Sequence, residues 1–165
     1  MTVRGKRWLR LGLWLLTVAW MGLIFYFSLE NADSSDATSG RVIRWLLTHF
    51  DRSFLQLPPE EQLLRIGDLS FVVRKLAHFI LFAGMGFLAF AAFSVDLPPR
   101  RAFPAALGLG AGRASLDEVP PSFVPGRSCE FRDVCIDTAG VLLGASFLLL
   151  VLLLVRRKKH SEQKI

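Results

Sequence analysis

The chain has 165 residues, of which 52% are hydrophobic and 21% are charged, and its formal net charge is +6. The apolar residues are concentrated in long runs and do not recur at the period of a half-buried strand or helix, which argues against a water-soluble globular domain. The lysines and arginines lie beside these runs, as the positive-inside rule expects, so nucleic-acid binding is not indicated. Two cysteines, Cys129 and Cys135, are too few for a disulfide framework.

The first predicted element is a transmembrane helix at about residues 9–28, built on the uncharged run from Leu11 to Phe27. At about 1.5 Å per residue this run reaches roughly 26 Å, close to the ~30 Å hydrocarbon core of a bilayer. The preceding segment, MTVRGKRWLR, is similar to the start of a signal peptide. The apolar run is longer than a signal peptide needs, and no A-x-A site follows it, so we expect the helix to be retained.

The segment at about residues 29–70 is expected to form an extracytoplasmic loop. It begins SLENADSSDATSG, a connector rich in residues that cap helices. Apolar residues then recur on one helical face, at Val42, Ile43, Leu46, Leu47 and Phe50. This spacing predicts a short amphipathic helix on the membrane surface. Pro58, Pro59 and the two glutamates that follow predict the start of a second short helix.

Three later segments complete the predicted membrane domain. Uncharged runs predict transmembrane helices at about residues 71–95 and 133–155. The segment at about 102–119 carries three charged residues, and hydropathy alone does not predict that it crosses. Basic clusters precede the first helix, follow the second and follow the last, and all three can face the cytoplasm only if 102–119 crosses as well.

We therefore expect an all-α membrane protein that forms a single domain over residues 1–165. It has four transmembrane helices and short amphipathic helices in the first extracytoplasmic loop. The expected location is the cell membrane, with several spans and with both termini in the cytoplasm.

Ionisable residues of three predicted helices lie at one depth. Measured from the cytoplasmic end of each helix, His78, Asp117 and Asp137 lie roughly 25, 22 and 27 Å along the axis. That level is the outer edge of the ~30 Å core, where the cost of a charge falls. Arg113 lies deeper, so it must reach Asp117 at i+4 or another carboxylate.

The spacing within the last helix indicates which way its acids face. Asp133 and Asp137 share one face, and this face continues through Gly140 and Gly144, a small-xxx-small pattern that lets another helix approach closely. Both aspartates are therefore expected to face the bundle interior. Their expected partners are the basic residues at the start of the second helix, Arg74, Lys75 and His78.

Each of these residues also has a purely structural interpretation. Arg74 and Lys75 are suited to anchor a helix at the interface. A histidine such as His78 can be a hydrogen-bonded interior residue, and the aspartates can form an ion-pair network that only stabilises the bundle. The sequence leaves these alternatives open.

Four segments together resemble the VanZ-like family of small bacterial membrane proteins, named for a component of a teicoplanin (glycopeptide) resistance cluster. They are FSLENADSSDATSG, RKLAHFILFAGMGFL, DEVPPSFVPGR and RDVCIDTAGVLLG. The resemblance implies a four-helix membrane protein of the cell envelope with a poorly defined activity. It also implies that the polar motif residues, the candidate binding cluster, are Arg74, Lys75, His78, Asp117, Glu118, Arg127, Asp133 and Asp137.

The sequence departs from the family pattern at one place. Members usually carry a His-Gln pair after the Asp-Glu motif, whereas Pro120 and Pro121 stand here. Two prolines remove two side-chain hydrogen-bonding groups and two backbone donors. A ligand site that requires the His-Gln pair is therefore not expected here.

Three functions are compatible with these features. The first is a non-enzymatic protein whose polar cluster binds a lipid headgroup, a cell-wall precursor or a glycopeptide antibiotic, since arginines suit phosphate and carboxylates suit amines or hydroxyls. The second is a membrane enzyme acting on a lipid-linked phosphate, with His78 as acid or base and Asp133 and Asp137 holding a divalent ion. The third is a structural or assembly helper without a ligand.

We favour the binding protein over the enzyme, because the sequence has no HExxH motif and no nucleophile elbow. No cofactor and no bound metal are expected. The expected partners are membrane lipids, with a glycopeptide or cell-wall precursor as a further candidate, and no nucleic acid. The sequence does not indicate the oligomeric state.

Overall fold

The computed structural model describes residues 3–28, 32–117 and 131–162, with side chains described over 3–28, 39–117 and 131–158. Its elements in chain order are α1 (Val3–Ser28), α2 (Ala32–Phe50), the short 3-10 helix η1 (Phe54–Gln56), α3 (Pro59–Ser94), α4 (Pro99–Asp117) and α5 (Phe131–Glu162). The described part of the chain is therefore helical and contains no strand.

In the part of the chain that the structure describes, three helices are long and apolar enough to cross a bilayer. They are α1, α3 and the part of α5 from Phe131 to Lys158. These correspond to the first, second and last predicted transmembrane helices. The fourth, α4, forms at the predicted place but does not belong to this group, so length and composition do not establish a four-span count.

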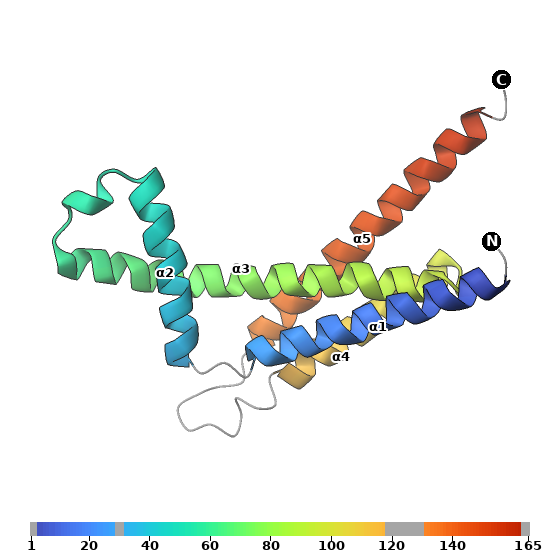
Figure 1. Cartoon of the computed structure of the whole chain (residues 1–165), viewed down its shortest axis with the longest axis horizontal. Helices are drawn as coiled ribbons and strands as arrows, with labels where there is room; N and C mark the ends of the chain where they lie inside the picture. Colours follow the sequence, from blue (N-terminus) through green and yellow to red (C-terminus); the bar gives the residue numbers. More distant parts are fainter. Residues whose placement is uncertain (1–2, 29–31, 118–130, 163–165) are drawn as a thin grey trace.

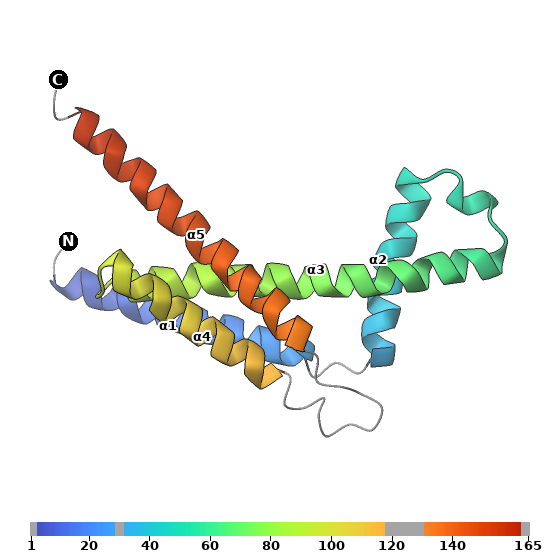
Figure 2. The ribbon, with the colours of Figure 1, turned by 180° about the vertical axis from the view of Figure 1, so that it is seen from behind.

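The helices α1, α4 and α5 gather around one half of α3 (Figures 1 and 2). The first two lie along α3, while α5 crosses it obliquely, and the C-terminal half of α5 extends away from the bundle. The most extensive packing is between α3 and α5. Many apolar side chains on the outer surfaces of these helices, such as Leu15, Val18 and Leu143, are exposed. Such a surface suits contact with lipid.

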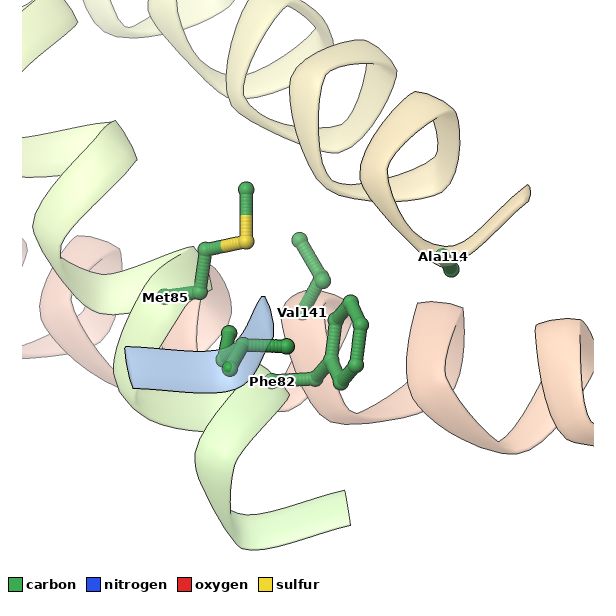
Figure 3. Close-up of a cluster of buried hydrophobic side chains, with 5 residues drawn as sticks. Phe82, Met85, Ala114 and Val141 are labelled. Carbon is green, nitrogen blue, oxygen red and sulfur yellow. The ribbon is translucent and has the colours of Figure 1, made fainter. Parts of the chain in front are cut away.

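The interior of the bundle is built from small and apolar side chains. One cluster, shown in Figure 3, contains the buried residues Ile24, Phe82, Met85, Ala114 and Val141. A second cluster contains Ala89, Phe90, Ala102, Ala106 and Ala145. The alanines of α4 and α5 leave room for the aromatic side chains of α3, so the helices pack closely.

The helix α3 is longer than predicted. The short helix expected at Pro59 and the transmembrane helix expected at about 71–95 are one continuous helix of 36 residues. Pro59 occupies its first turn with Glu60 and Glu61, which is a favourable helix start. Gly67 does not interrupt it. At about 1.5 Å per residue α3 is roughly 54 Å long and exceeds the ~30 Å hydrocarbon core.

The first half of α3 carries a second, smaller packing unit. Here α2 crosses α3 transversely (Figure 1). Ile43, Phe54 and Ile66 form a small core, with Leu47, Leu57, Leu69 and Val73 packed against it. A helix thus forms at the predicted place, and it begins earlier than its apolar stripe, at Ala32. Part of the stripe, including Val42, Leu46 and Phe50, stays exposed.

A polar turn joins α2 to α3. The Asp51 carboxylate accepts hydrogen bonds from the Ser53 hydroxyl (2.5 Å) and the Ser53 backbone N–H (3.1 Å). Arg65 of α3 lies 3.1 Å from the same carboxylate. The Ser53 hydroxyl bond, together with Arg65, holds the pKa of Asp51 below its usual value of 3.8.

Candidate functional site

A cluster of ionisable side chains lies where α3, α4 and α5 meet. On α3 and α5, Lys75 Nζ donates a hydrogen bond to Asp133 Oδ2, and both side chains are largely covered. One turn further along, His78 Nδ1 lies 3.8 Å from Asp137 Oδ2. The Asp137 side chain is only 6% exposed. Both predicted acids therefore face the bundle interior and the basic start of the membrane part of α3.

Two glycines of α5 set this alignment. A Cβ atom at Gly140 would collide with the carbonyl oxygen of Phe79, and one at Gly144 would collide with that of Ala83. The backbones of α3 and α5 are thus in direct contact, as the small-xxx-small pattern predicted. Since the two helices run in the same direction, the residues one turn before Gly140 face the turn of α3 that precedes Phe79.

The helix α4 contributes a buried ion pair. Arg113 Nη1 donates to Asp117 Oδ1, and the two side chains are 8% and 6% exposed. This confirms the predicted i, i+4 pairing. The Arg113 guanidinium also lies 5.6 Å from the centre of the Phe25 ring on α1, and the Ser28 side chain of α1 contributes to the surroundings of Asp117.

The ion pair of α4 and the pairs between α3 and α5 belong to one group. The charges of Lys75 and Asp117, as well as that of Asp137, act on the His78 imidazole. His78 therefore lies within electrostatic reach of one carboxylate of α4, Asp117, and one carboxylate of α5, Asp137.

Several polar atoms of this group have no hydrogen-bond partner among the described residues. They are Asp117 Oδ2, Asp133 Oδ1 and Arg113 Nη2, all of them buried. A buried polar group without a partner costs about 1–3 kcal/mol. Carboxylate oxygens of this kind can accept bonds from an added donor without breaking an existing contact.

The structure does not describe all the remaining members of the predicted cluster. Arg74 precedes Lys75 on α3 and also has an interaction partner. Glu118 and Arg127 lie outside the described residues, as do Pro120 and Pro121. The structure therefore brings together five predicted residues: Lys75, His78, Asp117, Asp133 and Asp137.

The structure adds residues that the sequence reasoning did not single out. Phe71 of α3 lies under two cations, with Lys75 Nζ 5.2 Å and the Arg132 guanidinium 5.3 Å from its ring centre. The i, i+4 spacing of Phe71 and Lys75 was a usable signal. Phe25 and Ser28 carried no such signal, because only the packing of α1 brings them to α4.

The carboxylates of the cluster do not converge on one point. Within the described ranges, no three His, Cys, Asp or Glu side chains are grouped closely enough to hold a metal ion. Each aspartate instead pairs with a different basic residue. The arrangement is one of separate ion pairs with unfilled acceptor positions.

The chain matches the model of one known protein family. The family model VanZ/LLP1 matches residues 13–154, from the first half of α1 into the last third of α5. Comparison with curated proteins and with solved structures gives no match. The matched range contains all of α3 and α4, most of α1 and α5, and every member of the polar cluster, and the chain belongs to the VanZ/LLP1 family.

Proposed function

We propose that the protein is a four-span protein of the cell envelope with both termini in the cytoplasm. Ion pairs support the placement of the start of α1 and the α3–α4 turn at the same end of the bundle. Lys6 Nζ and Arg10 Nη1 of α1 lie 3.8 and 3.4 Å from the carboxylate of Asp96, in the α3–α4 turn. The C-terminal end of α5 lies on the same side (Figure 1). The three basic clusters thus share one end, which the positive-inside rule assigns to the cytoplasm.

The packing of α4 supports its crossing. At about 1.5 Å per residue its length is roughly 28 Å. Ala102, Ala106, Gly110 and Ala114 form a buried face against its neighbours. The two charged residues near its end, Arg113 and Asp117, form an ion pair, which reduces the cost of placing them near lipid.

Cysteine labelling tests this topology. In intact cells, an impermeant thiol reagent should label Ser35→Cys and leave Ser161→Cys unlabelled until the cells are opened. The background should carry Cys129→Ser and Cys135→Ser. Labelling of Ser161→Cys in intact cells, with Ser35→Cys protected, would reverse the orientation.

The polar cluster binds the polar head of a membrane amphiphile. One observation carries this proposal: Asp117 Oδ2 and Asp133 Oδ1 are buried acceptors without a donor among the described residues. Acceptors at the edge of the membrane suit an amine or hydroxyl group. Lipid headgroups, cell-wall precursors and glycopeptide antibiotics all carry such donors.

Thermal unfolding of the purified protein with matched lipids tests the ligand chemistry. A ligand that binds only the native state raises the melting temperature. Phosphatidylethanolamine has N–H donors, whereas phosphatidylcholine has none, so only the first should stabilise the protein. Asp133→Asn should weaken this difference. Equal effects of the two lipids, with no effect of teicoplanin or of a lipid-linked cell-wall precursor, would reject the proposal.

The variant Asp137→Asn distinguishes a cluster that binds a ligand from a cluster that only stabilises the helix bundle. The change keeps the shape of the side chain and removes its charge. If the cluster binds a ligand, the variant folds and inserts but loses ligand stabilisation and any glycopeptide resistance that the protein confers. A variant that fails to accumulate, while its folded fraction still binds as the parent does, would show that the cluster only holds the helices together.

A further inference from the structure

The helix α2 has three distinct sides. Successive residues are turned by about 100° around a helix axis. The side with Gly40, Ile43 and Leu47 faces α3: Ile43 is buried in the shared core, and a Cβ atom at Gly40 would touch Ile66. The other two sides of α2 are turned by roughly 90° from this one, in opposite directions around the helix axis. Their side chains are exposed.

The two open sides differ in chemistry. One carries apolar residues, with Val42 47% and Leu46 39% exposed, and continues to Trp45, which is 57% exposed. The other carries Arg41 and Arg44, both exposed. Because α2 crosses α3 transversely, these sides look along the α3 axis, one toward the bundle and one away from it.

The level at which α2 crosses is set by α3. Its contacts on α3 extend from Ile66 to Val73. Counted from Val95 at the opposite end of the membrane part, these residues lie roughly 33 to 44 Å along the axis. The hydrocarbon core is ~30 Å thick, and headgroups lie immediately outside it. The crossing point therefore lies outside the hydrocarbon core, at the level of the headgroups and the water just beyond them.

We propose that α2 lies flat in the headgroup layer of the outer leaflet. Its Val42 and Leu46 side faces the acyl chains, and its Arg41 and Arg44 side faces water and lipid phosphates. The occupant of the exposed apolar side is the bilayer surface. This placement is independent of any ligand bound by the polar cluster, although it uses the same membrane orientation.

Two features favour a lipid surface over a protein partner. The apolar side is bordered by arginines, a pattern typical of helices that bind anionic lipid surfaces. At the edge of the apolar side, the Trp45 ring lies against the His49 ring, with ring centres 4.7 Å apart. Aromatic side chains with a polar atom are enriched at the membrane–water boundary.

Nitroxide accessibility of the full chain in vesicles tests this inference. The vesicles contain phosphatidylcholine and phosphatidylglycerol, and the background carries Cys129→Ser and Cys135→Ser. The spin label on Leu46→Cys should collide with oxygen, which concentrates in lipid, and be protected from a water-soluble nickel chelate. The label on Arg44→Cys should show the reverse. Ile43→Cys, at the α3 contact, serves as the control for packing and should be shielded from both.

Three results would contradict the proposal. Equal collision of the Leu46 and Arg44 labels with the nickel chelate would place both sides of α2 in water. Shielding of the Leu46 label from both reagents would show that protein, such as a second copy of the chain, covers the apolar side. In vesicles of phosphatidylcholine alone the Leu46 label should lie less deep, and an unchanged depth would reject the role assigned to the arginines.

Discussion

Gly144 of α5 lies directly against the backbone carbonyl oxygen of Ala83 on α3, and a Cβ atom at this glycine would overlap that oxygen. Gly144→Ala must therefore push the two helices apart. Overpacking of this kind typically costs 1–3 kcal/mol, so we expect about that loss in the free energy of unfolding. Chemical denaturation in detergent, followed by circular dichroism, measures it.

The matched control is Gly108→Ala on α4. A Cβ atom at Gly108 meets nothing within 4 Å. Since alanine is the better helix former, this variant should be as stable as the parent or more stable. A similar loss in both variants would mean that the Gly144 contact does not hold α5 in place.

Removing the carboxylate of Asp117 should destabilise the bundle strongly. Asp117→Asn leaves the buried Arg113 guanidinium without its counter-ion, and breaking a buried pair in this way costs about 3–5 kcal/mol. The double variant Arg113→Leu/Asp117→Leu removes both charges and should recover much of this loss. If the loss of unfolding free energy in the double variant equals the sum of the losses in the two single variants, the two residues act independently.

The contact of Trp20 with α3 gives a third stability prediction. Trp20 Nε1 donates a 2.8 Å hydrogen bond to the carbonyl oxygen of Leu81, and its ring packs on Gly84. Trp20→Phe loses the bond and part of the packing, so we expect a loss of about 1–2 kcal/mol. Trp8→Phe is the control, because Trp8 is 67% exposed on the same helix. Comparable melting temperatures for the two variants would contradict this role.

The turn between α2 and α3 should loosen in acid. Because the folded pKa of Asp51 is lower than its usual value of 3.8, the ionised carboxylate stabilises the turn above that pH. This contribution is lost as the pH falls below 3.8 through the folded pKa. A spin label on Arg52→Cys should therefore become more mobile over this range. With Asp51→Asn added, it should be mobile throughout, and an unchanged pH response would exclude Asp51 as the cause.

Much of the fold could be predicted because membrane helices are recognisable from local features. Long uncharged runs identified α1, α3 and α5, and the i, i+4 rule predicted the pairing of Arg113 with Asp117. The glycine stripe also indicated the face of α5 that meets another helix. Each of these signals lies within one stretch of sequence.

Other features depend on contacts between distant segments, which spacing does not reveal. The pairing of Lys75 with Asp133, and of His78 with Asp137, follows from where the backbones of α3 and α5 touch. The continuity of α3 through Gly67 was missed because a proline-initiated helix and an apolar run look like separate elements. The burial of Ile43 required the small core around Phe54.

The unbroken length of α3 links two separate parts of the molecule. Its first half carries α2, its second half carries the Trp20 contact, and the contact of Gly140 with Phe79 lies between them. Because α3 is one continuous helix of 36 residues, a single element fixes the position of α2 relative to the Trp20 contact.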